Sequence, residues 1–171
     1  MQAHNRHLYH ALALARECEP TSTAYNVGCV ITKELGQGLS SVVVSEGYSR
    51  ELLGNTHAEQ CALEKLSDIP LSDISDSYTL YSTMEPCSER LSGQTPCAQR
   101  IISFGRITSV IIAVREPDTF VDCIGVEQLQ RAGITVAFSD DIDLQSQCLE
   151  VAKVGHKKVE TCNGFSKVTS E

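Results

Sequence analysis

Two short stretches of the chain carry residue types that bind metals or move protons. Cys87 and Cys97 lie on either side of nine polar-loop residues in MEPCSERLSGQTPC, and His57 and Glu59 open the segment HAEQCALEKL. One imidazole and two thiolates would leave the fourth position of a tetrahedral zinc ion open, as in catalytic zinc sites. Zinc lowers the pKa of a water molecule in that position to about 7, and a carboxylate such as Glu59 could move its proton.

Each motif alone has a simpler explanation. Two thiols at this spacing are more often buried core residues, and a His-x-Glu pair is common by chance. Cys61 is a rival ligand because it lies four residues after His57, on the same helix face. We favour Cys87 and Cys97 because a proline precedes each and restricts its backbone. The remaining cysteines have no partner motif and are interpreted as structural: Cys18, Cys29, Cys123, Cys148 and Cys162.

The predicted elements that position these residues alternate between helix and strand. Apolar residues at helical spacing predict helices over residues 4–18, 56–66, 96–104, 121–132 and 140–154. Compact apolar runs rich in β-branched residues predict strands over residues 26–33, 41–48, 78–83, 108–114 and 134–138. Thr56 with Glu59 three residues later predicts a capping box at the second helix. We therefore expect an α/β fold of three layers, with helices on both faces of a mixed five-stranded sheet.

The composition narrows the class of protein. A length of 171 residues suits a single domain over residues 1–171, and a net charge of -8 argues against a broad contact with nucleic acid. No apolar stretch reaches the roughly 20 residues of a membrane helix. The first residues show no pattern of a secretory signal. We expect a cytoplasmic protein without a membrane or nucleic-acid partner, whose eight cysteines are mostly buried thiols or metal ligands.

Five segments together resemble the zinc deaminases, and among them the riboflavin-pathway pyrimidine deaminases. YNVGCVI, HAEQCAL, MEPCSERLSGQTPC, REPD and GVEQLQRAGITV match that family in order, between about Leu8 and Phe138. The long loop between the two cysteines separates this branch from zinc deaminases with a short Cys-x-x-Cys. Because no reductase domain follows, the chain is similar to the stand-alone fungal-type deaminases.

The resemblance implies a cytidine deaminase-like fold, a zinc cofactor and a homodimer. It implies that His57, Cys87 and Cys97 hold zinc, that Glu59 is the proton shuttle, and that Asn26 orients the pyrimidine. Glu85 is expected to orient the zinc ligands from behind. The implied substrate is 2,5-diamino-6-ribitylamino-4(3H)-pyrimidinone 5'-phosphate, which loses an amine as ammonia.

Two arginines and one replaced residue surround the expected substrate site. Ser49 stands where family members have a histidine near the substrate, and the loop between the cysteines lacks a lysine near Gln94. Arg50 and Arg90 lie in loops beside the zinc motifs, and a guanidinium suits phosphate oxygens. Each could equally be a solvated surface arginine.

The last residues, 156–171, form a polar tail. Its simplest interpretation is a frayed chain end. The alternative prediction is that the tail folds over the crevice, with His156, Lys157 or Lys158 near the phosphate.

Two other functions remain open from the residues. The first is a zinc deaminase acting on adenosine in transfer RNA or on another nucleobase, against which the long loop and the negative charge argue. The second is a non-enzymatic zinc-binding partner subunit, in which a proton shuttle such as Glu59 would be unnecessary.

Overall fold

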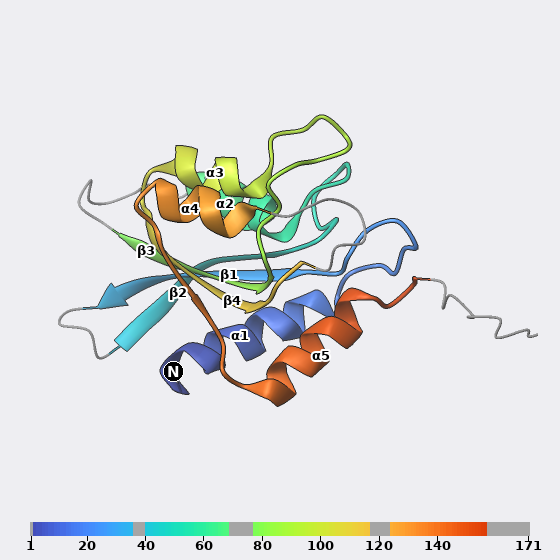
Figure 1. Ribbon diagram of the computed structural model, residues 1–171, viewed down its shortest axis with the longest axis horizontal. Coiled ribbons are helices and arrows are strands. Elements are labelled where there is room, and N and C mark those ends of the chain that lie inside the picture. The colour runs from blue at the N-terminus through green and yellow to red at the C-terminus, as the bar shows by residue number, and fades with distance from the viewer. Residues whose placement is uncertain (1, 36–39, 69–76, 117–123, 157–171) are drawn as a thin grey trace, which may run out of the picture.

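The computed structural model describes residues 2–35, 40–68, 77–116 and 124–156. Their strands form one sheet in the order β2-β1-β3-β4-β5 (Figure 1). β1 pairs antiparallel with β2 and β3, and the pairs β3–β4 and β4–β5 are parallel. The mixed sheet was predicted correctly. The strands are β1 (Gly28–Leu35), β2 (Ser40–Tyr48), β3 (Tyr78–Met84), β4 (Ile107–Val114) and β5 (Thr135–Phe138).

Helices cover both faces of this sheet, as predicted (Figure 1). They are α1 (Gln2–Ala15), α2 (Ala58–Ser67), α3 (Cys97–Phe104), α4 (Gly125–Arg131) and α5 (Ile142–Ala152). Neighbouring strand residues point to opposite faces. In β1, Ile31 packs into the core beneath α2, α3 and α4, whereas Val30 packs into the core beneath α1 and α5. The sheet is therefore buried on both faces.

The start of α2 differs from the predicted capping box. His57, not Thr56, is the N-cap residue, and its side chain makes no capping hydrogen bond. The Thr56 hydroxyl instead donates to the carbonyl of Leu52, 3.1 Å away. The prediction was wrong because Thr56 closes the preceding loop, while the His57 imidazole turns toward Cys87 and Cys97.

Other boundaries shift by a few residues. α1 ends at Ala15 rather than at residue 18, and α5 ends at Ala152. The predicted helix over 121–132 is described only from Gly125 onward, because residues 121–123 lie outside the described ranges. Within those ranges, no helix is long and apolar enough to cross a membrane.

Two glycines allow helices to lie directly on the sheet. A Cβ at Gly28 would lie 1.9 Å from the carbonyl oxygen of Ala11 in α1. A Cβ at Gly47 would lie 2.7 Å from both the carbonyl oxygen of Ala58 and the amide nitrogen of Ala62 in α2. Because these atoms belong to helix backbones, they cannot move independently. Gly47 therefore sets how closely the N-terminal turn of α2 approaches the sheet.

We predict that Gly47→Ala destabilises the protein by about 1–3 kcal/mol, because the added methyl group overpacks the contact with α2. Chemical denaturation measures the change in the free energy of unfolding. Val42→Ala, on the exposed part of the same strand, is the control and should cost less. Equal effects of the two substitutions would contradict the importance of the close approach.

Candidate functional site

Three metal-binding side chains from separate elements meet at one edge of the sheet. His57 precedes α2, Cys87 follows β3, and Cys97 begins α3. The His57 Nδ1 atom lies 3.5 Å from each of the two sulfur atoms, and all three ligand atoms lie within 4.8 Å of one another. A tetrahedral zinc ion with ordinary bond lengths separates nitrogen from sulfur by about 3.6 Å. The three side chains therefore fit zinc, and they leave one coordination position for another molecule.

Cys87 also completes the N-terminus of α3. The N-cap residue, Pro96, has no side chain that could accept a hydrogen bond. Instead the amide of Cys97 donates to the Cys87 sulfur at 3.4 Å, and the amide of Ala98 donates to the Cys87 carbonyl at 3.1 Å. Amides at a helix N-terminus stabilise a thiolate. The metal site and the start of α3 are thus built by the same contacts.

Because Cys87 and Cys97 lie close together, the pKa of one thiol is lowered and the pKa of the other is raised. The hydrogen bond from Cys97, together with the His57 imidazole, lowers the pKa of Cys87 to about 4. The hydrogen bond of Cys97 with Cys87, together with the burial of Cys97, raises the pKa of Cys97 well above the usual range. A first thiolate forms readily, whereas a second negative charge beside it needs a cation. This is the behaviour expected of a pair of ligands for a divalent metal.

Glu59 lies in the first turn of α2, two residues after His57, and is 3% exposed. Its Oε1 atom accepts a hydrogen bond from the Ser82 hydroxyl at 3.2 Å. Burial and the neighbouring Cys87 sulfur raise the pKa of this carboxyl group. A carboxylate held in one orientation beside a metal site can take up and release protons there.

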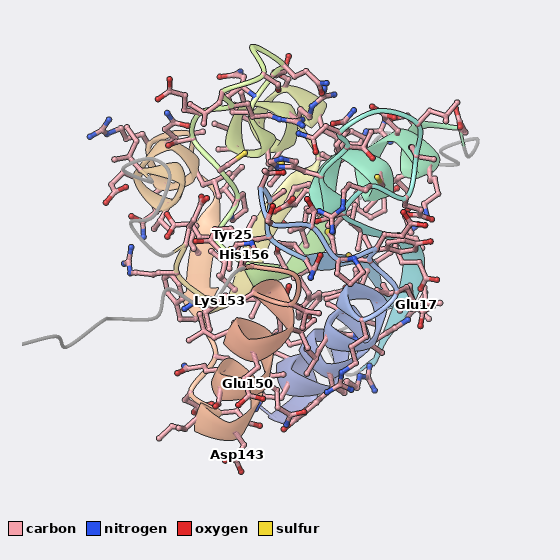
Figure 2. The ribbon with its side chains drawn as sticks, turned by 90° about the vertical axis from the view of Figure 1, so that its right-hand side faces the viewer. Glu17, Tyr25, Asp143, Glu150, Lys153 and His156 are labelled. Atoms are coloured by element: carbon pink, nitrogen blue, oxygen red, sulfur yellow. The ribbon has the colours of Figure 1, made fainter. Side chains whose placement is uncertain are left out.

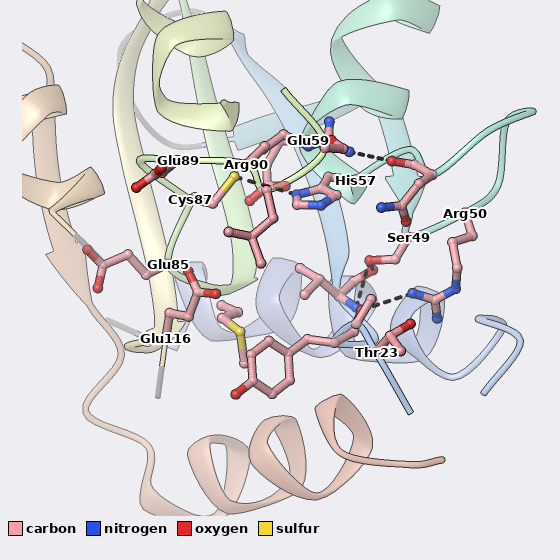
Figure 3. A pocket seen from close by; sticks show the side chains of 17 residues that line it. Thr23, Ser49, Arg50, His57, Glu59, Glu85, Cys87, Glu89, Arg90 and Glu116 are labelled. Carbon is pink, nitrogen blue, oxygen red and sulfur yellow. Dashed lines mark hydrogen bonds between the residues drawn. The ribbon is translucent and has the colours of Figure 1, made fainter. Parts of the chain in front are cut away.

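A cavity opens beside His57 and Cys87 (Figure 3). It collects residues that precede β1 and residues that follow β2, β3 and β4, because all these ends lie at the same edge of the sheet. His57, Cys87 and Glu59 all line the cavity. Its other charged lining residues are Arg50, Arg90, Glu85, Glu89 and Glu116.

Arg90 joins the loop between the two cysteines to the start of α2. Its guanidinium donates to Gln60 Oε1 at 2.9 Å and to the carbonyl of Asn55. The residue is 7% exposed, so it is not the solvated surface arginine of the alternative interpretation. Within the described ranges, neither of its acceptors is a carboxylate. Arg90 therefore brings to the cavity wall a positive charge that these two neutral acceptors do not cancel.

Arg50 is held in a similar way on the opposite wall (Figure 3). Its guanidinium donates to the carbonyls of Glu19 and Tyr25, at 2.8 and 3.1 Å, and to Asn26 Oδ1. Asn26 itself does not line the cavity. Its side chain is bonded to Arg50 and to the carbonyls of Val151 and Val154, and its contact with a pyrimidine stays a prediction.

Ser49 and Glu85 line the cavity, and the side chain of each accepts a hydrogen bond from a backbone amide. The Ser49 hydroxyl accepts from the amide of Val27 at 3.1 Å. Glu85 accepts from the amide of Val126 at 3.1 Å, at the start of α4, and lies 3.6 Å from Arg115. These contacts anchor α4 to the end of β3, and the role of Glu85 in orienting the zinc ligands stays a prediction.

His156 is the last described residue, and it lies next to Tyr25 in the segment before β1 (Figure 2). Its ring stacks on Tyr25 with centroids 5.1 Å apart, and its Nε2 atom lies 3.0 Å from the carbonyl oxygen of Ala24. Tyr25 and Ala24 line the cavity, whereas His156 does not. Lys157 and Lys158 lie outside the described residues.

Sequence reasoning missed Ser82, which orients Glu59, and Gln60, which holds Arg90. The position of Gln60 directly after Glu59 was visible, but no local pattern indicates an arginine 30 residues away as its partner. The rival ligand Cys61 is fully buried, and its Cβ atom faces Gly47. Cys18, Cys29 and Cys148 are buried free thiols, and Cys123 and Cys162 lie outside the described residues.

Comparison with known families and proteins points to one class. The model of the cytidine and deoxycytidylate deaminase zinc-binding region matches residues 1–114. A protein of Schizosaccharomyces pombe named diaminohydroxyphosphoribosylamino-pyrimidine deaminase is 42% identical over 153 residues, which cover 90% of this chain. The chain spans 36% of the length of that relative.

Solved structures of the Rib2 deaminase of Aspergillus oryzae share the fold. A C-terminal deletion mutant at pH 4.6 superposes with a TM-score of 0.81 at 34% identity, covering 91% of this chain and 93% of the other. The same deaminase in complex with DARIPP gives a TM-score of 0.78 at 33% identity, covering 90% and 92% of the two chains. The three-layer fold predicted from the sequence is confirmed by this similarity.

We predict one zinc ion per chain, and its loss in Cys87→Ser and in Cys97→Ser, because a serine hydroxyl is a poor substitute for a thiolate ligand. Metal analysis of the purified variants measures the content. Cys61→Ala is the matched control and should retain zinc. Full zinc in both serine variants, or its loss in the Cys61 control, would contradict the ligand set.

Proposed function

The chain belongs to the family of the cytidine and deoxycytidylate deaminase zinc-binding region, and from that premise we propose that it is a zinc-dependent deaminase of riboflavin biosynthesis. The proposed substrate is 2,5-diamino-6-ribitylamino-4(3H)-pyrimidinone 5'-phosphate. Water replaces one amine of the pyrimidine, which leaves as ammonia. The observation that carries this proposal is the placement of Glu59, His57 and Cys87 on the wall of a cavity that also holds two arginines, neither of which has a carboxylate partner among the described residues.

The metal site and Glu59 together suit hydrolysis of a cyclic amidine. Zinc held by His57, Cys87 and Cys97 would supply a water molecule that is acidic enough to react near neutral pH. We assign Glu59 the transfer of protons from that water to the ring nitrogen and then to the departing amine. The hydrogen bond from Ser82 keeps the carboxylate oriented for both transfers. A site that only stabilised the fold would close all four zinc positions with protein ligands.

The two arginines support a phosphorylated substrate. Both guanidinium groups bond only to neutral oxygen atoms within the described residues. An arginine paired with a carboxylate offers little net charge to a phosphate, whereas these two retain theirs. We therefore propose that Arg50 and Arg90 contact the phosphate or the polar chain that carries it, next to the hydroxyl of Ser49. Among the described residues, the cavity lining also has four carboxylates (Glu59, Glu85, Glu89 and Glu116), so its charge suits a single phosphate held at the arginines better than an extended polyanion such as RNA.

The choice of substrate draws on the relatives. The name of the S. pombe protein describes a deaminase of a phosphoribosylamino-pyrimidine, and the A. oryzae deaminase was crystallised with DARIPP. In this chain, the long loop between the cysteines positions Arg90 at the cavity. A short Cys-x-x-Cys connection, typical of deaminases acting on nucleic acid, would leave no room for that arginine.

We predict that the purified protein releases ammonia from the ribitylaminopyrimidine phosphate, but not from cytidine or from transfer RNA. Glu59→Gln should lower kcat by about a hundredfold to ten-thousandfold, the usual contribution of a proton-transferring side chain. It should retain zinc and the fold, because the amide keeps the shape of the carboxyl group.

An ammonia-release assay with matched zinc content measures both effects. Glu127→Gln, at an exposed position of α4 and absent from the cavity lining, is the control and should keep wild-type turnover. Deamination of RNA would identify the rival nucleobase deaminase. Zinc binding without any ammonia release would identify a non-enzymatic partner subunit.

We further propose that the tail, residues 156–171, covers the cavity when substrate binds. The support is the contact of His156 with Tyr25 and Ala24, because it brings the start of the tail to residues that line the cavity. Lys157 and Lys158, the next two residues in the sequence, would then approach the phosphate and oppose the cavity carboxylates. Exclusion of water would strengthen each ionic contact.

Truncation after His156 tests this proposal, because it removes residues 157–171 but preserves the ring contact between His156 and Tyr25. We expect KM for the phosphorylated substrate to rise severalfold, while zinc content and the melting temperature stay unchanged. A full-length variant with Lys157 and Lys158 both replaced by glutamine separates charge from coverage. Wild-type kinetics in the truncated protein would show that the tail has no part in the reaction.

The proposal extends to a homodimer in a reducing compartment such as the cytoplasm. All six cysteines in the described ranges are free thiols, as is usual where disulfides do not form.

Leu53 and Leu91 are 102% and 80% exposed, and they lie in loops that contribute to the cavity wall. Large exposed apolar side chains suit contact with a second copy. Sedimentation velocity measures the state, and a monomer at high micromolar concentration would contradict the dimer.

A further inference from the structure

Arg50 adopts an unusual backbone conformation at the cavity. With a φ angle of 68° it is the only residue other than glycine with a positive φ in the part of the chain that the structure describes. Residues with a Cβ atom rarely adopt a positive φ angle, and they keep this conformation where their surroundings hold them. The backbone amide of Arg50 donates to the carbonyl of Thr56 at 2.7 Å, which closes the loop before α2. The conformation directs the side chain across to the segment before β1.

The segment before β1 receives the guanidinium with three neutral oxygen atoms. Two are carbonyls, of Glu19 and Tyr25, and the third is the amide oxygen of Asn26. The Nε atom of Arg50 is buried and has no hydrogen-bond partner among the described residues. A buried guanidinium normally satisfies its donors. Arg50 therefore combines a fixed position with a positive charge and a donor that none of the described residues uses.

Asn26 is bonded on both sides of its amide group. Its Nδ2 atom donates to the carbonyls of Val151 and Val154, at 3.1 and 2.9 Å, where α5 ends. Its backbone amide donates to the carbonyl of Ala152 at 3.0 Å. The residue is 2% exposed. With both amide hydrogens bonded to α5 and its oxygen bonded to Arg50, Asn26 has no remaining donor for a substrate.

We infer that Asn26 is a positioning residue for phosphate binding, which fixes Arg50 at the cavity by tying its guanidinium to the C-terminal end of α5. The inference rests on the proposed function, in which Arg50 contacts the phosphate. Asn26 does not touch the substrate; it acts only through Arg50. The end of α5 thereby becomes part of the support of the substrate site, although none of its residues lines the cavity.

The chemistry of the amide explains why asparagine suits this position. An aspartate would also hold the guanidinium, but its charge would neutralise Arg50 and would face the carbonyls of Val151 and Val154. The neutral amide oxygen holds the arginine without competing with an anion, and the amide hydrogens satisfy the carbonyls at the helix end. No other residue type of this size supplies one acceptor and two donors.

A double-mutant cycle tests the inference, using the substrate with and without its 5'-phosphate. We expect Arg50→Ala to raise KM for the phosphorylated substrate by about tenfold to hundredfold, as for loss of a hydrogen bond to a charged group. Asn26→Ala should raise the same KM by about tenfold, with kcat nearly unchanged. In the double variant, the effect should not exceed that of Arg50→Ala, because residues that act through one another are not additive. Neither change should alter KM for the dephosphorylated substrate.

Asn26→Asp separates positioning from charge. It keeps an acceptor for Arg50 but adds a carboxylate, so KM for the phosphorylated substrate should still rise. If both Asn26 variants fail to fold, Arg50→Lys decides the question, because it keeps the charge but cannot make the forked contacts with Asn26 and the carbonyls. Wild-type KM in Arg50→Lys would overturn the inference.

The outcomes distinguish the inference from the proposed function. Additive effects of the two alanine substitutions, or an equal rise in KM for both substrates in Asn26→Ala, would mean that Asn26 contacts the substrate directly. A lower melting temperature with unchanged KM would mean that it only stabilises α5. If Arg50→Ala leaves KM unchanged in an active enzyme, the assigned phosphate contact is wrong. If the wild-type protein releases no ammonia, the proposed function itself fails.

Discussion

The N-termini of α2 and α3 meet above the end of β3, and the functional site depends on that meeting. Each helix brings a ligand at its first turn, and each is held at a fixed height over the sheet. For α2 the constraint is the missing side chain at Gly47, where helix backbone and strand backbone are in contact. For α3 it is Cys87, whose sulfur and carbonyl oxygen accept the first two amides of the helix. The positive ends of two helix dipoles therefore converge where thiolates and a carboxylate must be stabilised.

Among the described residues, few of the charged side chains around this point are paired with an opposite charge. The two arginines in the cavity wall are held by carbonyl and amide oxygens, and Glu59 is held by a serine hydroxyl. Burying a charge beside neutral dipoles costs more free energy than pairing it with an opposite charge. Such an arrangement is expected where a bound molecule or ion completes the pairing, and perturbed groups of this kind gather at functional sites. Glu85 behaves differently, since it pairs with Arg115 and binds the start of α4.

The cavity is supported from both layers of helices. α2 and α3 supply the metal ligands from one face of the sheet. From the other face, the end of α5 supports the segment before β1 through Asn26, and His156 stacks against Tyr25 (Figure 2). Residues that are more than 100 positions apart in the chain thus support one wall of the cavity. Because Tyr25 stacks on His156, a shift of residues 153–156 would act directly on that wall.

The sequence by itself determined the elements and the metal ligands. Apolar residues at alternating or helical spacing indicated five strands and five helices, because burial on the faces of a sheet imposes those periods locally. The motifs around His57, Cys87 and Cys97 named the ligands, since each motif carries its chemistry within a few residues. Only the tertiary structure decided the partners of Asn26, Glu85, Arg90 and Glu59. Their hydrogen bonds join residues 23 to 128 positions apart, and no local pattern records a contact that exists only after the layers have packed.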